Sequence, residues 1–485
     1  MKKRICFRAD GDPKIGLGHL FRLAALAEKL KSDFHCVLFT CSDPDLIKKT
    51  IGDFFQEIHF LTSASLHLEA KELGSKLSRN DILVLDGYPF DTEYQRILKK
   101  AGVFLVTMDD YHPYPVMADL VINIADGERL RNAYQSPFYT RFLFGFKQSL
   151  LRKPFVEAAK TGNQVSGKSV FVCLGGADPE NRISILMRDV LQHYPEDPIH
   201  VVLGSAFVHY EQFFEDYGMM GNVKIHHSLK ADEMVHLMRR AKIGFCSSST
   251  IAYEFLCCND QLVIIRTAAN QLNLFDYLHE SKVAVPFTDW LKGKNETNRS
   301  VLESWRKEMV DYSYPDLFHS IAEETEYYIQ EADFSDLELY FEWANDPDTR
   351  SQSFNSNPIP FEEHQKWFAE KMGDESQLLL KLKRENESVG QVRFSIEGNT
   401  ATVNYSLDKK FRGKGLSFVL MKKAIEYIIF HHPEIEKVQG WVKLENVASQ
   451  KAFLKNAFKE FNDELNEIKV LRYEMDMIHF SNLKL

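Results

Sequence analysis

A glycine-rich turn near the start of the chain brings together residue types that could carry out acid–base chemistry. Gly16 and Gly18 follow a short apolar run, and His19 and Arg22 begin the helical pattern that comes next. Glycine lets a backbone approach a ligand closely, and the first turn of a helix has free N–H groups. Residues three apart share a helix face. We predict that His19 contacts a ligand or acts as a general acid or base, in preference to a capping or packing role.

The same turn lacks two nucleotide-binding signatures. Gly11 and Gly16 have the spacing of a P-loop, but Leu17 stands where its lysine would follow. Phe21 stands where a dinucleotide fingerprint would have its third glycine. The turn therefore argues against a P-loop and against NAD binding.

Three later turns are candidate anion sites. Gly175 and Gly176 end an apolar run before a helical segment, and Ser249 and Thr250 precede another. Helix N-termini bind anions, so both turns could hold a diphosphate or a sugar. A third turn is basic and glycine-rich, and its consecutive amides could cradle a pyrophosphate, although plain strand–helix connections look similar. It consists of Arg412, Gly413, Lys414, Gly415, Leu416 and Ser417.

The elements that must position these residues alternate between short apolar runs and helical patterns over about the first 320 residues. Such alternation predicts buried parallel strands in doubly wound α/β sheets. The strands are expected at Lys3–Phe7, Cys36–Thr40, Ile82–Asp86, Val103–Met108 and Leu120–Ile124, and then at Ser169–Leu174, Ile199–Leu203, Val223–His226, Ile243–Cys246 and Leu262–Arg266. We predict two Rossmann-like lobes that face each other across a cleft, 1–155 and 165–325, joined by a polar linker at Pro154–Lys168.

The pattern changes towards the C-terminus. Helical segments are expected to about Glu331, and an α+β domain is expected at 333–485. Its helices are predicted at Leu337–Trp343 and Phe361–Lys371. Its first antiparallel strands are predicted at Gln377–Leu382, Ser388–Ile396 and Thr400–Leu407.

Composition narrows the classes of function. The 485 residues suit about three domains. A net charge of −10 argues against a dedicated nucleic-acid binder. No apolar run is long enough for a membrane helix or a signal peptide, and the seven cysteines lack zinc-site spacing. We expect a cytoplasmic protein with reduced thiols, small-molecule ligands, and neither a nucleic-acid nor a membrane partner.

The order of motifs in the first 320 residues or so resembles the nucleotide-sugar hydrolases of pseudaminic acid synthesis, which are relatives of GT-B glycosyltransferases. Besides the turn around His19, the matching residues are Arg8, Asp10, Leu85-Asp86-Gly-Tyr88, Met108-Asp109-Asp110, Ala118-Asp119-Leu-Val-Ile-Asn123, Leu174-Gly175-Gly176-Ala-Asp178-Pro179-x-Asn181, Val202-Leu-Gly204-Ser205, Thr250-x-x-Tyr-Glu254 and Asn270-Gln271.

This resemblance implies a GT-B-like arrangement that hydrolyses UDP-2,4-diacetamido-2,4,6-trideoxy-β-L-altropyranose to the free sugar and UDP. His19 would activate the attacking water, Tyr88 and Asn270 would lie near the sugar, and Glu254 would hold the uridine ribose. The further substrate or UDP contacts that it implies are Arg8, Asp10, Gly16, Gly18, Arg22, Gly175, Gly176, Ser249, Thr250 and Gln271.

The chain departs from that family at two places. Cys246–Ser249 replaces a small glycine-rich stretch, and Asn259–Gln261 replaces a Gly-x-Pro. The adjacent Asp109 and Asp110 could indicate a metal, but such scaffolds neutralise the leaving diphosphate with helix dipoles. We therefore interpret the pair as structural or substrate-positioning and expect no metal.

Residues from about 333 to 480 resemble the GNAT acetyltransferase superfamily. The resemblance rests on the turn at Arg412–Ser417 and on Leu444-Glu-Asn446-x-x-Ser449-x-x-x-Phe453. The segment Glu342-Trp343-Ala-Asn345-Asp-Pro, with Arg350, Glu363, His364 and Trp367, looks like amino-sugar N-acetyltransferases. The implied cofactor is acetyl-CoA, with its pyrophosphate on the amides of that turn and Asn446 beside the pantetheine arm or the cofactor.

One departure affects the acetyltransferase chemistry. Phe453 falls where the family often has a tyrosine that protonates the thiolate, so Tyr405 or water must serve, or the domain is slower or altered. Phe453 itself is expected to pack in the core. His364 and Trp367 lie one helical turn apart, and either a structural role or a place in the acceptor pocket is open.

The sequence therefore favours a bifunctional enzyme of a UDP-amino sugar. Its N-terminal part would hydrolyse the sugar nucleotide and its C-terminal domain would N-acetylate the 4-amino sugar. Two alternatives stay open: a GT-B glycosyltransferase, and a non-catalytic nucleotide-sugar binding module with a degenerate acetyltransferase domain.

Overall fold

The computed structural model describes residues 2–12, 16–63, 65–111, 113–161, 167–176, 178–204, 207–227, 229–465 and 467–477. The chain forms two compact units. The first comprises Met1–Leu98, Phe104–Gln135 and Arg141–His319, and the second Lys99–Val103, Ser136–Thr140 and Ser320–Leu485. Of the predicted motifs, Ile15, Ala177 and Ser205 lie outside the described residues, as do residues 162–166 of the predicted linker.

The first lobe of the N-terminal unit is built on a seven-stranded sheet in the order β3-β2-β1-β4-β5-β6-β7. Every neighbouring pair is parallel. Its elements are β1 (Arg4–Ala9), α1 (Gly18–Leu30), β2 (His35–Thr40), α2 (Pro44–Thr50), η1 (Gly52–Phe54), β3 (Glu57–Phe60), α3 (Leu66–Lys76), β4 (Ile82–Asp86), α4 (Thr92–Lys100), β5 (Phe104–Met108), β6 (Leu120–Asn123), α5 (Glu128–Ala133), β7 (Arg141–Phe144) and η2 (Phe146–Gln148).

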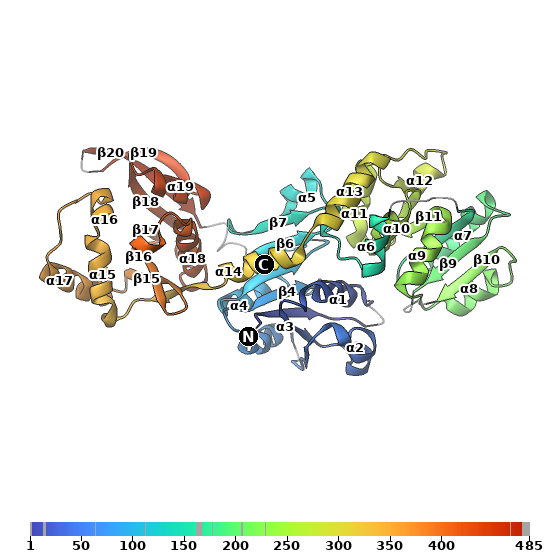
Figure 1. Cartoon of the computed structure of the whole chain (residues 1–485), viewed down its shortest axis with the longest axis horizontal. Coiled ribbons are helices and arrows are strands. Elements are labelled where there is room, and N and C mark those ends of the chain that lie inside the picture. Colours follow the sequence, from blue (N-terminus) through green and yellow to red (C-terminus); the bar gives the residue numbers. More distant parts are fainter. Residues whose placement is uncertain are drawn as a thin grey trace. The chain divides into compact units, whose positions relative to one another are not determined.

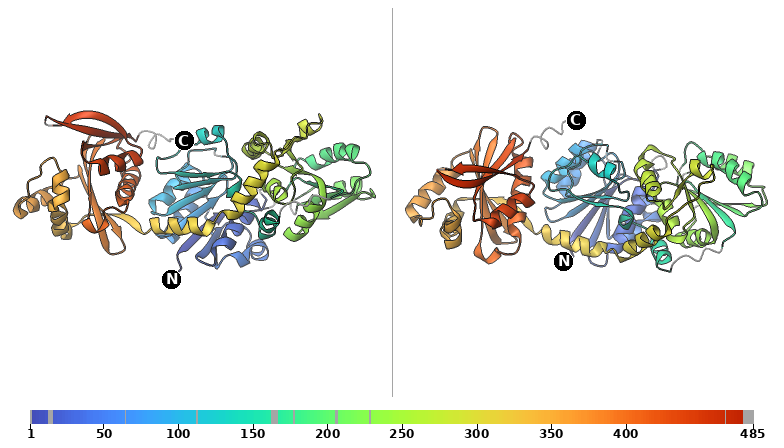
Figure 2. Two further views of the ribbon diagram at one scale, coloured as in Figure 1. Left: turned by 45° about the horizontal axis from the view of Figure 1, so that its top comes forward. Right: turned by 90° about the horizontal axis from the view of Figure 1, so that it is seen from above.

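The second lobe has a six-stranded parallel sheet in the order β10-β9-β8-β11-β12-β13. Its elements are α6 (Lys153–Lys160), β8 (Ser169–Cys173), α7 (Arg182–His193), β9 (Ile199–Leu203), α8 (Tyr210–Tyr217), β10 (Val223–His227), α9 (Ala231–Arg240), β11 (Ala241–Ser247), α10 (Thr250–Cys258), β12 (Leu262–Ile265), η3 (Ala269–Gln271), α11 (Leu272–Glu280), β13 (Val285–Pro286), α12 (Phe287–Trp290) and α13 (Arg299–Asp311). The next helix, α14 (Tyr314–Glu324), contacts the first lobe: Tyr314 donates to the Gln148 carbonyl, and the Phe318 ring packs edge-on against Phe34. Both lobes have helices on the two faces of the sheet (Figures 1 and 2).

The predicted fold class of the two lobes is confirmed, and each predicted strand is present within about two residues of its expected ends. The sequence missed β3, β7 and β13, which all lie at or next to a sheet edge. β3 alternates exposed and half-buried residues, and none of the four residues of β7 is fully buried. β3 therefore lacks the apolar run on which the prediction depended, and β7 and β13, with four and two residues, are short.

Two other expectations were wrong. The first half of the expected linker is the helix α6, because Phe155 is fully buried in the core that α6 shares with the second lobe. The expected helical segment up to Glu331 ends at Glu324. Tyr327–Glu331 instead forms β14, which pairs antiparallel with β15.

The C-terminal unit is an α+β domain around a seven-stranded sheet in the order β14-β15-β16-β17-β18-β20-β19. The predicted helices and strands of this domain are present. Its elements are β14 (Tyr327–Glu331), η4 (Phe334–Asp336), α15 (Leu337–Asn345), α16 (Pro347–Gln352), α17 (Phe361–Met372), β15 (Gln377–Arg384), β16 (Glu387–Glu397), β17 (Thr400–Leu407), η5 (Lys409–Phe411), α18 (Leu416–His431), β18 (Lys437–Lys443), α19 (Val447–Lys455), β19 (Lys459–Leu465) and β20 (Ile468–Asp476).

One pair of strands in this sheet separates. β17 and β18 pair in parallel only over Thr400–Thr402 and Lys437–Gln439, whereas all other neighbours are antiparallel. The rest of β17, to Leu407, has its other edge on β16 and no ladder with β18. Figure 1 shows α15 and α17 on one side of the sheet and α18 on the other. The sheet therefore opens at its centre, between two helical layers.

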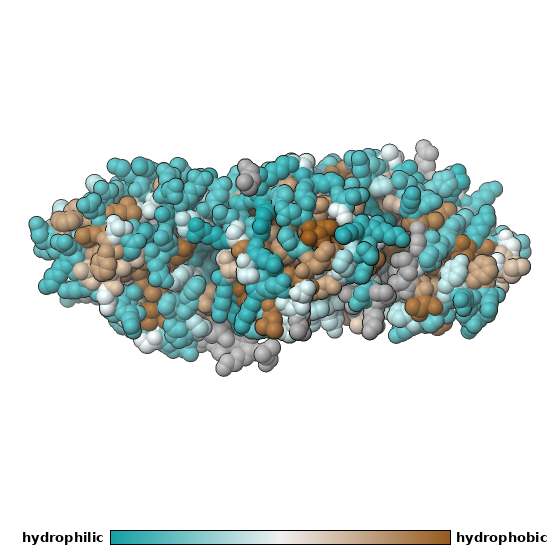
Figure 3. Space-filling model, turned by 90° about the horizontal axis from the view of Figure 1, so that it is seen from below, coloured by the Kyte–Doolittle hydropathy of each residue, from teal (hydrophilic) through white to brown (hydrophobic). Residues whose placement is uncertain are grey.

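The remaining expectations from composition concern thiols and membranes. All seven cysteines are free, and all except Cys41 are buried. Within the described ranges, no helix has both the length and the apolar character that crossing a bilayer would require. Hydrophilic residues predominate on the face drawn in Figure 3, with hydrophobic patches between them.

Candidate active sites

His19 and Asp86 form a hydrogen-bonded pair at the carboxyl edge of the first sheet. His19 is the second residue of α1, and Asp86 is the last residue of β4. Their Nδ1 and Oδ1 atoms are 2.7 Å apart, and the Asp86 side chain is fully buried. A carboxylate accepts the Nδ1 proton, which leaves Nε2 as the ring nitrogen with a lone pair. This arrangement suits a general base that faces away from Asp86.

Arg22 ties this pair to a second carboxylate. Its Nη2 and Nε atoms donate to the two Asp86 oxygens at 2.6 and 2.7 Å, and its Nη1 donates to Asp110 at 2.7 Å. Burial alone would raise the pKa of Asp86, but the charges of Arg22 and His19 hold it below the usual value. Asp86 therefore stays ionised, and the network fixes the orientation of His19.

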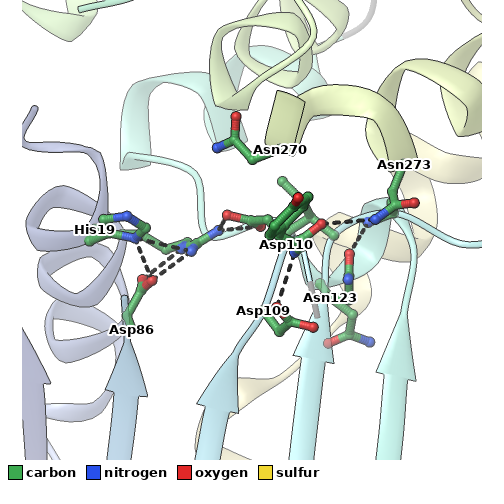
Figure 4. A network of polar contacts seen from close by, with 12 residues as sticks. His19, Asp86, Asp109, Asp110, Asn123, Asn270 and Asn273 are labelled. Atoms are coloured by element: carbon green, nitrogen blue, oxygen red, sulfur yellow. Dashed lines mark hydrogen bonds and ion pairs between the residues drawn. The ribbon is translucent and has the colours of Figure 1, made fainter. Parts of the chain in front are cut away.

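Residues of the second lobe close over this network (Figure 4). The amide of Asn270 donates to the Tyr88 hydroxyl, and the Tyr88 ring packs edge-on against His19 with centroids 4.9 Å apart. Asn273 donates from Nδ2 to the Asp110 carbonyl at 3.0 Å. Burial raises the pKa of Tyr88 to about 12, so its hydroxyl stays protonated. The structure thus brings the predicted His19, Tyr88 and Asn270 together, from both lobes.

Asp109 belongs to a separate set of contacts beside Asp110. The Tyr134 hydroxyl donates to its carboxylate, and Asn123 donates from Nδ2 to that hydroxyl at 2.9 Å. The Tyr111 N–H also donates to Asp109, at 3.0 Å. Among the residues that the structure describes, no group of three or more His, Cys, Asp or Glu side chains could hold a metal ion. The aspartate pair is thus held by tyrosine, amide and arginine donors.

Arg8, which the sequence analysis expected to contact the substrate or UDP, is occupied by contacts within the protein. Its side chain is fully buried, pairing with Asp10 at 2.6 Å and Glu69 at 2.8 Å and lying over the Phe90 ring. A guanidinium with both carboxylates in place has a structural role. Asp10 also accepts the Cys41 N–H at 2.7 Å. The Arg8 contacts therefore hold Asp10 and the strand ends beside the turn.

The predicted glycines of the first turn lie next to His19. The Gly16 N–H donates to the Asp12 carbonyl at 2.8 Å, which closes the turn, and Gly18 begins α1. A side chain at either glycine would extend into open space. The backbone on this side of His19 is therefore accessible to a ligand.

In the second lobe, the two predicted turns adjoin each other. A Cβ at Gly175 would lie 3.5 Å from the Ser247 hydroxyl and 4.0 Å from the Ser249 hydroxyl, while Gly176 faces open space. Ser249 is the N-cap of α10, and Thr250 is its first residue. The Gly175 turn and the backbone amides at the start of α10 therefore lie next to each other, so their N–H groups could bind the same anion.

Glu254 and Gln271 have different surroundings. Arg152 donates to Glu254 Oε1 from Nη2 at 2.7 Å and Nε at 2.9 Å, and burial raises the pKa of this carboxyl while Arg152 opposes the rise. Gln271 accepts the Thr267 N–H at 2.8 Å and so fixes its own loop. In the structure Gln271 therefore stabilises its own loop, and Arg152 fixes the orientation of the Glu254 carboxylate.

Sequence reasoning gave no role to Asp86, Asn273 or Arg152. The position of Asp86 at the end of a predicted strand was a usable signal, because the carboxyl ends of parallel strands meet at one edge of a sheet. Asn273 and Arg152 carry no such signal. Their contacts depend on how distant segments pack.

In the C-terminal domain, the basic turn has a backbone that only glycine adopts readily. Gly413 and Gly415 have φ values of 75° and 74°, and both are exposed. Arg412 donates to Asp346 at 2.6 Å and to Asp348 at 2.9 Å, so its guanidinium anchors the turn. Leu416, the first residue of α18, is buried in the core of the domain. The turn can therefore offer backbone N–H groups, including those of Leu416 and Ser417, and its Lys414 charge.

A cavity of about 750 Å³ opens beside this turn, where β17 and β18 separate. Of the predicted cofactor contacts, Arg412, Gly413, Ser417 and Asn446 line it, and Lys414, Gly415 and Leu416 do not. Asn446 also caps α19 by accepting the Ser449 N–H at 3.1 Å.

The cavity wall holds one pair of hydroxyls. Tyr405 donates to the Ser449 hydroxyl at 3.0 Å, and burial raises the pKa of Tyr405. Phe453 is buried and stacks on Tyr473 with centroids 4.9 Å apart. The Tyr405 ring lies edge-on to Phe453 with centroids 6.1 Å apart, so the Tyr405 and Ser449 hydroxyls are proton-bearing groups near the Phe453 position.

Comparison with known proteins agrees with this division of the chain. Residues 328–459 match the family model described as acetyltransferase (GNAT) domain. The chain is 22% identical over 420 residues to the uncharacterized protein MJ1062 of Methanocaldococcus jannaschii, covering 80% of this chain and 82% of that one.

It is also 22% identical over 294 residues to the UDP-2,4-diacetamido-2,4,6-trideoxy-beta-L-altropyranose hydrolase of Campylobacter jejuni, covering 59% of this chain and 99% of the hydrolase. A crystal structure of spermidine N-acetyltransferase from Vibrio cholerae in complex with CoA and spermine is 17% identical, with a TM-score of 0.31, and covers 33% of this chain and 99% of that one.

The fold and the family match define the C-terminal unit as a GNAT-like domain, which follows the two Rossmann-like lobes in the sequence. The two-part resemblance drawn from the sequence is confirmed: this chain is similar to a sugar-nucleotide hydrolase and carries a GNAT domain.

Proposed function

We propose that the chain is a bifunctional enzyme of a UDP-linked amino sugar. Residues 1–155 and 165–325 form the unit that hydrolyses UDP-2,4-diacetamido-2,4,6-trideoxy-β-L-altropyranose, or a close UDP-amino sugar, to the free sugar and UDP. Residues 333–485 transfer an acetyl group from acetyl-CoA to the 4-amino group. The observation that carries the hydrolase half is the His19–Asp86 pair at the carboxyl edge of a parallel sheet. Similarity over 99% of the hydrolase's length supports it.

In the hydrolytic step, His19 acts as the general base. Its Nε2 takes a proton from a water whose oxygen attacks the anomeric carbon of the sugar. The bond from that carbon to the phosphate oxygen breaks, and its electron pair leaves with UDP. Asp86, 2.7 Å from Nδ1, stabilises the imidazolium that forms. Tyr88 and Asn270, which touch each other across the two lobes, position the sugar.

The leaving UDP is held by the second lobe. The Gly175 turn and the N-terminus of α10 offer backbone N–H groups and a helix dipole to the diphosphate. Glu254 accepts hydrogen bonds from the two ribose hydroxyls, and Arg152 keeps the carboxylate oriented for them. These contacts stabilise the negative charge that develops on UDP as the bond breaks.

The C-terminal domain fits acetyl-CoA, which supplies its acetyl group as a thioester. The Gly413–Gly415 turn is exposed and Ser417 is half-buried, and their backbone amides at the N-terminus of the 16-residue helix α18 can bind the pyrophosphate. The residues of β17 beyond Thr402 have no ladder with β18, so their backbone groups on that edge can pair with the amides of the pantetheine arm.

Acyl transfer to an amine also needs a proton for the departing thiolate. Tyr405 and Ser449 provide hydroxyls 3.0 Å apart in the cavity, and Tyr405 stays protonated because burial raises its pKa. Tyr405 takes the role that Phe453 cannot perform, and Ser449 accepts its hydrogen bond and relays the proton.

The direct test uses purified full-length protein with acetyl-CoA and a UDP-4-amino-4,6-dideoxy sugar. Free CoA should appear first, followed by UDP and the free diacetamido sugar, identified by NMR. Folded protein that releases neither CoA nor UDP would refute the proposal. UDP that appears only when a sugar acceptor is added would identify a glycosyltransferase. Binding of UDP and acetyl-CoA in calorimetry without turnover would identify a binding module.

A further inference from the structure

The charged side chains that line the cavity of the C-terminal domain are unevenly matched. The cations of the lining are Arg350, Arg393, Arg412 and Lys443, and its carboxylates are Asp348 and Glu363. The acyl acceptor of the proposed function carries an amine, and an alkylamine is itself a cation at neutral pH. An acceptor that enters this cavity therefore brings a positive charge to a wall on which cations already predominate.

One of the two carboxylates is already paired. Asp348 accepts a hydrogen bond from Arg412 Nη1 at 2.9 Å, and Arg412 anchors the turn at Gly413–Gly415. An ammonium that displaced this guanidinium would release the turn proposed to hold acetyl-CoA. Asp348 therefore belongs to the support of the cofactor turn.

The other carboxylate, Glu363, has no partner within the protein. It is the third residue of α17 and is exposed, and its side chain forms no ion pair and no hydrogen bond with any residue that the structure describes. Trp367, one helical turn later, lines the same cavity, so this face of α17 forms part of the cavity wall. An ionised carboxylate in such a position can accept hydrogen bonds from a ligand.

His364, which follows Glu363, does not offer an alternative partner. It is 2% exposed, and its ring packs among those of Phe341, Trp367 and Phe368. Burial, and after it the charge of Arg393, lowers the pKa of His364, so the ring is neutral at neutral pH. Within the described ranges, Glu363 is thus the one cavity-lining carboxylate that is outside an ion pair.

The unpaired cations of the lining strengthen the preference for Glu363. Arg393 lies over the Trp367 ring at 5.0 Å, and Lys443 donates to the Ser351 carbonyl at 3.0 Å. Neither forms an ion pair with a carboxylate in the part of the chain that the structure describes. Like charges that meet in a binding site are unfavourable, so an ammonium is disfavoured beside these two residues and favoured beside Glu363.

We propose that Glu363 binds the protonated amine of the acyl acceptor and makes the domain select amines over the corresponding hydroxyl compounds. This inference rests on the proposed acetyltransferase function and names a residue that sets its substrate class. An ammonium donates charge-assisted hydrogen bonds to a carboxylate, whereas a hydroxyl carries no positive charge and gains less from the same position.

The test compares an amine with its hydroxyl analogue on the full-length protein. CoA release is measured with the UDP-4-amino-4,6-dideoxy sugar, and the same UDP-sugar with a hydroxyl in place of the amine serves as a competitive inhibitor. Glu363→Gln should raise KM for the amino sugar by about 10-fold and leave KM for acetyl-CoA unchanged. The inhibition constant of the hydroxyl analogue should change much less, because the analogue has no charge to lose a partner. Glu363→Asp should recover part of the loss.

Glu362→Gln is the matched control. Glu362 is the neighbouring residue in the first turn of α17, is also exposed and does not line the cavity, so its replacement changes the net charge equally. A second measurement needs no turnover: in calorimetry with CoA present, Glu363→Gln should reduce the difference in affinity between the two sugars, and Glu362→Gln should not. Binding to the first two lobes contributes equally in both variants and cancels in this comparison.

Each outcome decides for or against the assignment. An unchanged KM for the amino sugar in Glu363→Gln, or an equal loss of affinity for both sugars, would overturn it and leave the acetyltransferase standing. A raised KM for acetyl-CoA, or the same loss in Glu362→Gln, would also overturn it. Folded protein that distinguishes the two sugars through Glu363 but releases no CoA would refute the acetyltransferase and leave the amine site standing.

Discussion

The two candidate sites differ in how their charges are balanced. Around His19 every charged group has a partner: Arg22 joins Asp86 to Asp110, and Asp86 accepts from His19. In the acetyltransferase cavity, Arg393 lies over the Trp367 ring, and no carboxylate among the described residues forms an ion pair with it. A balanced network fixes geometry and suits a residue that must act on a neutral water. An unbalanced cation suits recognition, because the ligand completes the charge balance.

Of the tests of this difference in charge balance, His19→Ala should reduce activity the most. Without the imidazole, UDP release should fall by about 10²- to 10⁴-fold, because the remaining proton acceptors of the network, Asp86 and Asp110, are engaged by Arg22. CoA release should be unchanged, since the acetyltransferase cavity contains none of these residues. Timed assays of UDP and CoA on the same sample provide the measurement. His35→Ala is a matched control, because His35 pairs with Glu57 away from the site. Loss of both activities would contradict independent sites.

Asp86→Asn tests whether the balanced network works by orienting His19. The amide keeps the shape of the side chain but loses the charge that stabilises an imidazolium and selects the Nδ1–H tautomer. We expect UDP release to fall by about 10²-fold, mainly in kcat, and the acidic limb of its pH profile to move. A variant that loses activity with an unchanged pH profile would mean that Asp86 only supports the fold.

In the other site, Tyr405→Phe removes one hydroxyl and keeps the ring. CoA release should fall by about 10-fold, less than the loss at His19, because water can protonate the thiolate in its place. The loss should be larger at high pH, where fewer other proton donors remain. UDP release is the internal control. An unchanged rate of CoA release across the pH range would show that the hydroxyl pair takes no part.

The smallest effect concerns stability in acid. Arg22 and His19 hold the pKa of Asp86 below its usual value, so the ionised carboxylate stabilises the folded state. That contribution is complete above the unfolded value, near pH 4, and is lost as the pH falls through the lower folded value. The difference in free energy of unfolding between wild type and Asp86→Asn should therefore shrink below about pH 4. Urea titrations at a series of pH values measure it, and a constant difference would contradict the assignment.

The sequence predicted much of the fold for a simple physical reason. Central strands such as β4 and β5 are buried on both faces, so they are short apolar runs that are visible without any tertiary information. β7 and β14 could not be predicted in this way, because they bury few side chains and depend on pairing with a neighbour. The helix α6 was hidden because only one face of a polar segment enters the core.

The same distinction between local and long-range features applies to the candidate sites. The glycine-rich turns and His19 were predictable because their chemistry is local: a turn, a helix start and a side chain of suitable type. The burial of Arg8 could not be predicted, because its partner Glu69 is 61 residues away along the chain.

Local sequence patterns were enough to predict the layers of the molecule and to single out the glycine-rich turns and His19 as candidates. Which charged groups meet depends on the tertiary structure. It brings Asp86 to His19 and Asn270 to Tyr88, and it places Arg393 over Trp367 with no counter-ion in the described part of the chain. The reason is that periodicity and turn chemistry are properties of neighbouring residues, whereas charge balance depends on groups that are distant along the chain and adjacent in space.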